Sequence, residues 1–335
     1  MTLSTEHTGT AGANEPFDAG ISPSSWDGGA AQDLPTVPIY PGEMRAKRHH
    51  LIPAFYLRRF VDGNGRLTRF DLRTNEARVL AVDNAAVETD FYTILTDDGP
   101  SDAIESRLAQ IEGLAAEAMR NIDTRDGPLT DEDITGLANF VAVQLVRGRD
   151  FRDRINAVGD SVMKKITLLQ SQNPDAVRKH VQETTGEYPS EEALDEILSW
   201  MRDGDYTLEL HPNEAIRVML AAGAELVQPL AEMRWHLLAV TDPVFLASDR
   251  PITMWAGDPT PPFYGVGLAT ADEISLPLDP QKCLVITPLD KSPSLGPAHA
   301  PVELNRRTIA GAYRYVFGPP ADSLRARTSI GFEAT

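Results

Sequence analysis

Residues 137–147 read LANFVAVQLVR, a largely apolar run whose polar side chains include Gln144 and Arg147. At 100° per residue, Leu137 and Phe140 share one arc of a helix with Gln144, and Arg147 lies at the edge of that arc. A buried amide or guanidinium without a partner is costly, so each needs one. Two interpretations stay open: an internal polar network, or a site within the core in which Arg147 holds an anion.

The pattern around this run predicts a helical centre. Thr130 and Asp133 occupy capping-box positions, so the core helix begins there and continues past Ile155 unless Gly148 breaks it. Further helices are predicted at 101–122, 157–171, 175–184, 190–201 and 213–233, with Pro229 ending or kinking the last.

Strands are predicted on both sides of the helical centre. A short helix, His49–Phe60, precedes three extended pieces at 66–71, 77–82 and 91–95, which would form a small antiparallel sheet. Later strands are predicted at 235–240, 244–247, 252–255, 273–277, 284–287 and 313–317, with a helix at 302–312 before the last. This order predicts an α+β fold: small N-terminal antiparallel strands, a central helical region, and a C-terminal mixed or antiparallel sheet with a closing helix.

Composition limits the class of protein. The 335 residues include one cysteine, Cys283, which excludes an internal disulfide framework and a cysteine-based zinc cluster. No apolar run approaches the ~18 residues of a membrane span, and the N-terminus lacks the pattern of a signal peptide. We expect a soluble, cytoplasmic protein without a membrane partner. We predict an acidic disordered tail at 1–44, a single α+β domain at 45–320 and a C-terminal tail at 321–335.

Charge is distributed unevenly along the chain. The formal net charge is −18, and residues 1–44 contain six acids with no Lys or Arg. Residues 45–59 then form the densest basic stretch. A broad nucleic-acid surface is disfavoured, whereas a focused site for one phosphate or carboxylate is allowed. The acidic segment is either a solvated tail or a cover for the basic stretch.

Three further polar positions are candidates for chemistry. The adjacent His49 and His50 lie ahead of Pro53, and a neutral histidine there suits proton transfer or metal ligation. Asp249 follows a buried strand at a polar turn, where its carboxylate is either catalytic or hydrogen-bonded to the backbone of the turn. Asn305 either caps a helix or completes a polar site.

A family resemblance joins these positions. Residues 48–60, RHHLIPAFYLRRF, resemble the opening HH-x-x-P-x-x-Y-L-x-x-F motif of the bacterial and fungal family called domain of unknown function 4238. Four later segments are similar to further motifs of that family in the same order: 144–147 (QLVR), 245–251 (FLASDRP), 275–278 (SLPL) and 304–305 (LN). The chain departs from the family pattern at Arg250, where Asn is frequent. The resemblance spans about residues 45–318 and supplies no reaction.

The resemblance implies which polar residues recur together, and they are the ones singled out above: His49, His50, Gln144, Arg147, Asp249 and Asn305. We hypothesise that they meet in one pocket of a hydrolase or transferase that acts on an anionic substrate. The first substrate class to consider is a phosphodiester or nucleotide, which would make the protein a nuclease.

In that hypothesis His49, His50 and Asp249 are catalytic, and Arg147, Gln144, Asn305 and Arg48 bind substrate. A divalent metal, if used, would be held by His50 and Asp249. The alternative is a non-catalytic module that binds a ligand or partner, with the same residues forming a buried structural network. The sequence does not give the oligomeric state.

Overall fold

The computed structural model describes residues 2–3, 48–89, 91–96, 99–101, 103–125, 127–242, 244–258, 265–295 and 299–318. These residues belong to two compact units: Met1–Gly148 with Ile216–Thr335, and Arg149–Ala215. The sequence pattern did not predict a separate unit at residues 149–215. Apart from Thr2–Leu3, the tails predicted at 1–44 and 321–335 lie outside the described residues, so those predictions stay predictions.

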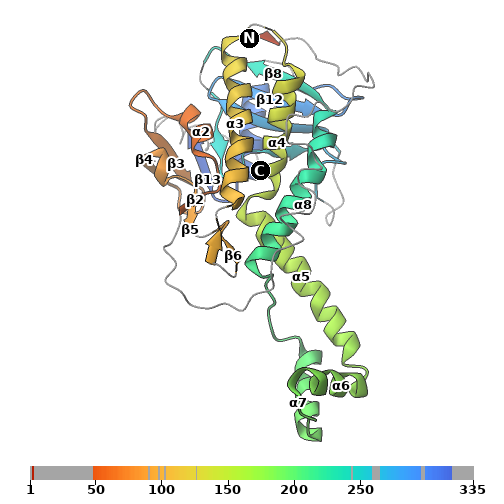
Figure 1. Cartoon of the computed structure of the whole chain (residues 1–335). Helices are drawn as coiled ribbons and strands as arrows, with labels where there is room; N and C mark the ends of the chain where they lie inside the picture. Colours follow the sequence, from red (N-terminus) through yellow and green to blue (C-terminus); the bar gives the residue numbers. More distant parts are fainter. Residues whose placement is uncertain are drawn as a thin grey trace. The chain divides into compact units, whose positions relative to one another are not determined.

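The first unit confirms the predicted α+β class. Its larger sheet is antiparallel, with the strand order β1-β8-β12-β11-β10. The strands are β1 (Thr2–Leu3), β8 (Arg234–Ala239), β10 (Thr253–Trp255), β11 (Glu273–Asp279) and β12 (Lys282–Thr287). Two helices, α3 (Ala103–Thr124) and α4 (Asp131–Val146), lie side by side across one face of this sheet (Figure 1).

The core of the first unit lies between these helices and the sheet. Leu137 and Phe140 of α4 are fully buried in one cluster with Ile274 and Leu276 of β11. The two helices approach closely, because a Cβ added at Gly136 would lie 3.1 Å from the carbonyl oxygen of Leu114. The segment that opened the sequence analysis is therefore the centre of the core, as its pattern predicts.

The boundaries of α4 follow from its caps. The Thr130 hydroxyl accepts the Asp133 N–H at 3.2 Å, and the Asp133 carboxylate accepts the Thr130 N–H at 3.0 Å, which confirms the capping box. The helix ends at Val146 with Arg147 as its C-cap. A separate helix begins at Arg149, so the helical conformation is interrupted at Gly148. Helix α4 therefore does not continue past Ile155.

A second antiparallel sheet pairs strands from the early and the late part of the described chain, in the order β4-β3-β13-β9. Its strands are β3 (Leu67–Asp71), β4 (Glu76–Leu80), β9 (Ala247–Ser248) and β13 (Tyr315–Gly318). The third N-terminal strand predicted at 91–95 is not part of this sheet. Instead, β6 (Ile94–Thr96) pairs with β7 (Gly99–Ser101). Strand β3 pairs with the neighbouring β4 on one side, but its partner on the other side is β13, far along the chain, a pairing that no local pattern contains.

The histidine pair lies in a strand rather than in the predicted helix. Strand β2 (Arg48–His50) pairs with β5 (Val87–Thr89), and helix α2 (Ala54–Leu57) begins only after Pro53. Pro53 is extended, with ψ of 135°, and serves as the N-cap residue. A 3₁₀ turn at Arg58–Phe60 follows. The inward packing predicted for Ile52, Tyr56 and Phe60 is confirmed, since all three are buried.

The second unit is helical. It contains α5 (Arg149–Gln170), α6 (Pro174–Thr185) and α7 (Glu191–Asp203) around a small core of Val177, Leu194, Leu198 and Met201. Asn173 and Ser190 cap α6 and α7 through their side chains. The segment 204–211 runs along α5, because the Leu208 and Leu210 N–H groups donate to Asp160 and Asn156.

Two helices complete the described chain. Helix α8 (Pro212–Ala231) begins in the second unit and continues into the first, and it ends two residues after Pro229, as predicted. Helix α9 (Ala300–Gly311) is the predicted closing helix, and β13 follows it. Among the described residues, no helix combines the length and apolarity needed to span a membrane.

Candidate functional site

Arg147 joins three segments of the first unit at the C-terminal end of α4. Its Nε donates to the Tyr92 hydroxyl at 3.2 Å, Nη1 to Glu112 at 2.7 Å and Nη2 to the His50 carbonyl at 2.6 Å. The Tyr92 hydroxyl in turn donates to the Arg147 carbonyl at 2.7 Å. Burial alone would lower the pKa of Arg147, but Tyr92 and Glu112 outweigh that effect and raise it. Arg147 is therefore a buried, fully charged clamp between β2, α3 and α4.

His49 is held by both ring nitrogens. Its Nδ1 accepts the Tyr92 N–H at 2.8 Å, and its Nε2 lies 3.1 Å from Glu105 Oε1. Because Nδ1 is an acceptor, these partners favour the tautomer that carries the proton on Nε2 and donates it to Glu105. The His49 side chain is only 2% exposed. His49 thus orients Glu105 rather than presenting a ring nitrogen to a substrate.

Both carboxylates of this arrangement come from α3. Glu105 and Glu112 are seven residues apart, so they lie two turns apart on one helix face. Their side chains are 42% and 25% exposed, so they connect the buried His49 and Arg147 to solvent. Sequence reasoning missed both glutamates and Tyr92, because none stands in a motif and α3 carries other acids. We define the β2–α4 cluster as His49, His50, Tyr92, Glu105, Glu112, Gln144 and Arg147.

Two residues of the β2–α4 cluster, Gln144 and Arg147, have unused hydrogen-bonding capacity. Gln144 is 7% exposed, and neither Oε1 nor Nε2 has a hydrogen-bond partner among the described residues. It precedes Arg147 by three residues, so the two share one face of α4. Arg147 also has five N–H donors, of which the described contacts use three. This face of α4 can therefore accept further polar partners.

Asp249 is bonded to main chain. Its carboxylate accepts the N–H groups of Tyr313 and Arg314 at 2.9 and 2.8 Å, and that of Tyr315 at 2.9 Å. Its own N–H donates to the Tyr315 carbonyl. Burial raises the pKa of Asp249, and the three backbone N–H groups offset only part of that rise. These are the contacts of a carboxylate that binds a turn to the start of β13.

Asn305 has a similar pattern of contacts. From α9, its Oδ1 accepts the Leu246 N–H at 3.0 Å and its Nδ2 donates to the Val244 carbonyl at 2.7 Å. Both partners lie in the segment that leads into β9. Asn305 does not cap α9, whose N-cap residue is His299. We define Asp249 and Asn305 as the β9–α9 pair.

The predicted site residues therefore form two sets. His49, His50 and Arg147 are joined by direct contacts or chain adjacency, whereas the described contacts of Asp249 and Asn305 reach none of them. The prediction that all six residues line one pocket stays a prediction. The side chain of Arg48, predicted to bind substrate, lies outside the described residues.

In the part of the chain that the structure describes, no group of three or more His, Cys, Asp or Glu side chains has the arrangement of a metal site. The assignment of His50 and Asp249 as metal ligands stays a prediction. Cys283 is buried in β12, and burial raises the pKa of its thiol. The basic stretch 45–59 is partly neutralised, because Arg59 forms ion pairs with Asp123 and Asp279.

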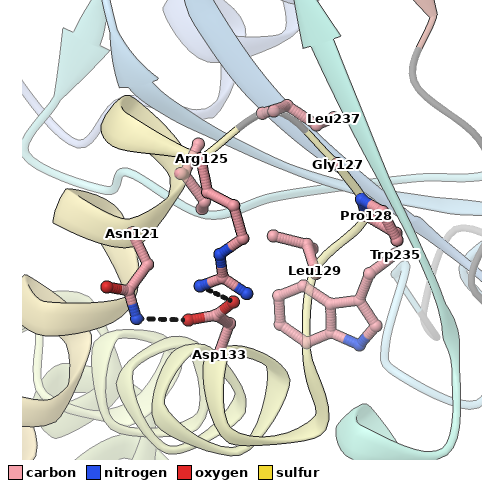
Figure 2. A pocket seen from close by; sticks show the side chains of 9 residues that line it. Asn121, Arg125, Gly127, Pro128, Leu129, Asp133, Trp235 and Leu237 are labelled. Carbon is pink, nitrogen blue, oxygen red and sulfur yellow. Dashed lines mark hydrogen bonds and ion pairs between the residues drawn. The ribbon is translucent and has the colours of Figure 1, made fainter.

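Figure 2 shows a small cavity away from the predicted residues, where Asn121 and Arg125 both reach the carboxylate of Asp133. Burial alone would raise the pKa of Asp133, but its hydrogen bonds with Asn121 and Thr130 and the charge of Arg125 lower it. The cavity holds about 20 Å³, which is room for water rather than for a substrate. This network secures the start of α4.

A larger cavity, of about 310 Å³, lies between α3 and α4. Its lining includes three further acids, Glu117, Asp131 and Glu132, beside apolar residues such as Leu114. An acidic lining repels an anion, so this cavity does not suit the substrate class expected from the sequence. It shares no residue with the β2–α4 cluster.

The arrangement defines an α+β protein whose core helix carries a buried polar cluster. A family model described as "Protein of unknown function (DUF4238)" matches residues 48–322, and the chain belongs to that family. This confirms the resemblance drawn from the five motifs. No curated protein and no solved structure matches the chain. The description of the family names no reaction, so function has to be argued from the residues.

Proposed function

We propose that the protein binds a small anionic substrate at the β2–α4 cluster and acts on it as a hydrolase or transferase. The observation that supports this most is the Gln144 amide, which is buried without a hydrogen-bond partner among the described residues. Leaving a buried donor or acceptor unsatisfied costs about 1–3 kcal/mol, so such a group is retained where a ligand or ordered water completes it.

In this proposal the substrate is held from one face of α4. The Gln144 amide offers two N–H donors and one carbonyl acceptor, and the two remaining N–H groups of Arg147 are charged donors suited to phosphate or carboxylate oxygens. Glu112 neutralises part of the Arg147 charge, so binding relies on directed hydrogen bonds more than on net charge.

In this proposal Glu105 and His50 carry out proton transfer. Glu105 is part-exposed and oriented by His49 Nε2, which makes it a candidate general base, with His49 as a positioning residue. His50 is half-buried, and its carbonyl is fixed by Arg147, which anchors the strand that carries its ring. Asp249 and Asn305 are assigned to the fold, since their contacts are with the main chain.

A non-catalytic ligand- or partner-binding module is the second candidate. It is favoured by the number of polar atoms in the cluster that already have protein partners: both ring nitrogens of His49 and all three guanidinium nitrogens of Arg147 take part in such contacts. Such contacts are typical of a network that stabilises a core.

The test is a thermal-shift screen of purified full-length protein against inorganic phosphate, pyrophosphate, adenosine monophosphate and bis(p-nitrophenyl) phosphate. A ligand that binds the native state raises the melting temperature. We expect at least one compound to raise it, and Gln144→Met to abolish that shift. Turnover of bis(p-nitrophenyl) phosphate, read as released nitrophenolate, would favour the hydrolase.

The control variant is Asn305→Leu, which alters a buried amide outside the β2–α4 cluster. It should keep the ligand shift although it lowers the melting temperature. Binding that survives in Gln144→Met and disappears in Asn305→Leu would contradict the assignment of the site. Binding without turnover, with Glu105→Gln behaving like the wild-type chain, would favour the non-catalytic module.

A further inference from the structure

Strands β3, β4 and β13, which lie side by side in Figure 1, carry a concentration of arginines in an otherwise acidic chain. Residues 66–80 contain four arginines and two acids, and residues 313–318 contain one arginine and no acid, so the local formal charge is +3. Because the whole chain has a formal net charge of −18, its other residues together carry −21. A positive region of this kind attracts an anion that the rest of the surface repels.

The register of the sheet places two of these arginines opposite each other. Arg69 of β3 and Arg78 of β4 are direct cross-strand neighbours. Side chains at such positions have Cβ atoms about 4.5–5.5 Å apart, and like charges there destabilise a sheet. Arg78 forms an exposed ion pair with Glu76, whereas Arg69 has no carboxylate partner among the described residues. An anion that bridges the two guanidinium groups would remove this repulsion.

Two guanidinium groups converge on the ring of Tyr315 on the same face of the sheet. The guanidinium carbon of Arg69 lies 4.4 Å from the centroid of that ring, and the guanidinium carbon of Arg314 lies 4.9 Å from it. Asp71 holds Arg314 in place, because its Oδ2 accepts from Nε at 2.9 Å and from Nη2 at 2.7 Å. A guanidinium held over a ring keeps its in-plane N–H groups suited to phosphate oxygens.

A second arginine–tyrosine pair adjoins the first. The guanidinium carbon of Arg73 lies 5.4 Å from the ring centroid of Tyr313. The Leu72 N–H donates to the Arg314 carbonyl, so the segment 313–315 runs against the end of β3. Arg73 is exposed, and Tyr313 is 38% exposed. We define the arginine strip as Arg69, Arg73, Arg78 and Arg314 with the tyrosines Tyr313 and Tyr315.

We propose that the arginine strip binds the backbone of a single-stranded nucleic acid. The arginines supply donors to phosphodiester oxygens, and an exposed tyrosine supplies a ring on which a base stacks. The strip crosses three neighbouring strands, or about 10 Å, which suits a single strand. A duplex would extend over the acidic remainder of the chain. An acidic peptide is the competing ligand, and it is disfavoured because carboxylates make no use of the tyrosine rings. This proposal does not rest on the proposed function, whose residues belong to the β2–α4 cluster.

The first experiment measures binding of the full chain to a fluorescein-labelled oligothymidylate by fluorescence anisotropy, between about 50 and 200 mM KCl. We expect the wild-type chain to bind and Arg69→Gln to raise the dissociation constant at least tenfold at the lowest salt concentration. Loss of one phosphate contact should also reduce the salt dependence, as the slope of log Kd against log salt, by about 0.7. Arg73→Gln, at an exposed position, should weaken binding in the same direction.

The matched control is Arg120→Gln, which removes the same charge from an exposed position on α3 and should bind like the wild type. A wild-type chain that does not bind the oligothymidylate would overturn the proposal. Equal weakening in Arg69→Gln and Arg120→Gln would also overturn it, because only net charge would then matter.

The second experiment separates a nucleic acid from an acidic peptide. Tyr313→Leu should weaken oligothymidylate binding about tenfold through lost stacking, and Tyr313→Phe should bind like the wild type because it keeps the ring. Unlabelled oligothymidylate should displace the labelled probe, and poly-L-glutamate of the same total charge should not. Displacement by poly-L-glutamate as effective as by the oligothymidylate, with Tyr313→Leu and Tyr313→Phe alike, would overturn the nucleic-acid assignment in favour of an acidic peptide.

Discussion

The β2–α4 cluster and the β9–α9 pair are both sets of buried and part-buried polar residues in one compact unit, but they differ in what remains unsatisfied. Asp249 and Asn305 bond to the main chain with every carboxylate or amide group engaged. The β2–α4 cluster leaves the amide of Gln144 without a partner among the described residues. Satisfied polar groups stabilise a fold, whereas leftover capacity costs stability and points to a ligand.

The largest expected effect comes from breaking the clamp in the β2–α4 cluster. Arg147→Met leaves Glu112 and the His50 carbonyl without their donor, and about 3–5 kcal/mol, the cost of breaking a fully buried pair, is the upper limit because Glu112 is 25% exposed. We expect a corresponding loss of unfolding free energy in urea. Arg178→Met is the control, since its partner Glu191 is exposed and the pair is worth little. Equal losses in the two variants would mean that the clamp does not hold the core.

A smaller loss is expected in the β9–α9 pair. Asp249→Ala leaves three backbone N–H groups near β13 without an acceptor, at about 1–3 kcal/mol where a group stays buried from water. The urea midpoint should fall, and the ligand shift at the β2–α4 cluster should persist. Loss of ligand binding together with an unchanged midpoint would instead place Asp249 in the site.

Asp133 and Asp249 should give opposite pH dependences. The pKa of Asp133 is lowered, so its contribution is present above its unfolded pKa of about 3.9 and is lost as the pH falls through the folded pKa. The pKa of Asp249 is raised, so the folded chain holds that proton longer, and stability falls as the pH rises through the folded pKa.

Urea unfolding between pH 3 and pH 7 measures the difference for Asp133→Asn and Asp249→Asn. The stability of the wild type relative to the variant should grow with pH for Asp133→Asn and shrink for Asp249→Asn. The same slope for both would contradict the assigned directions of the two pKa shifts.

Local patterns predicted what local physics decides. The capping box at Thr130 and the burial of Tyr56 depend on residues within a few positions of each other, and both are confirmed. The pairing of β3 with β13 and the contacts of His49 with Tyr92 and Glu105 depend on residues far apart in the chain. No periodicity encodes such contacts.

The candidate site shows the same division. The sequence identified Gln144 and Arg147 as polar residues in an apolar arc, and the structure shows that both are buried. It could not show that Arg147 donates to Glu112 while the Gln144 amide has no hydrogen-bond partner among the described residues, because these contacts depend on how α3 packs against α4. It also grouped Asp249 and Asn305 with them, since a motif records which residues recur and not what each one bonds.

The comparison of the two buried amides is tested most directly by the melting temperatures of Gln144→Met and Asn305→Leu in the absence of ligand. Removing an unsatisfied amide in favour of an apolar side chain should raise the melting temperature. Removing Asn305 strands the Leu246 N–H and the Val244 carbonyl and should lower it. Changes of opposite sign support the account. A clear fall in Gln144→Met would mean that this amide is as structural as that of Asn305, and would contradict it.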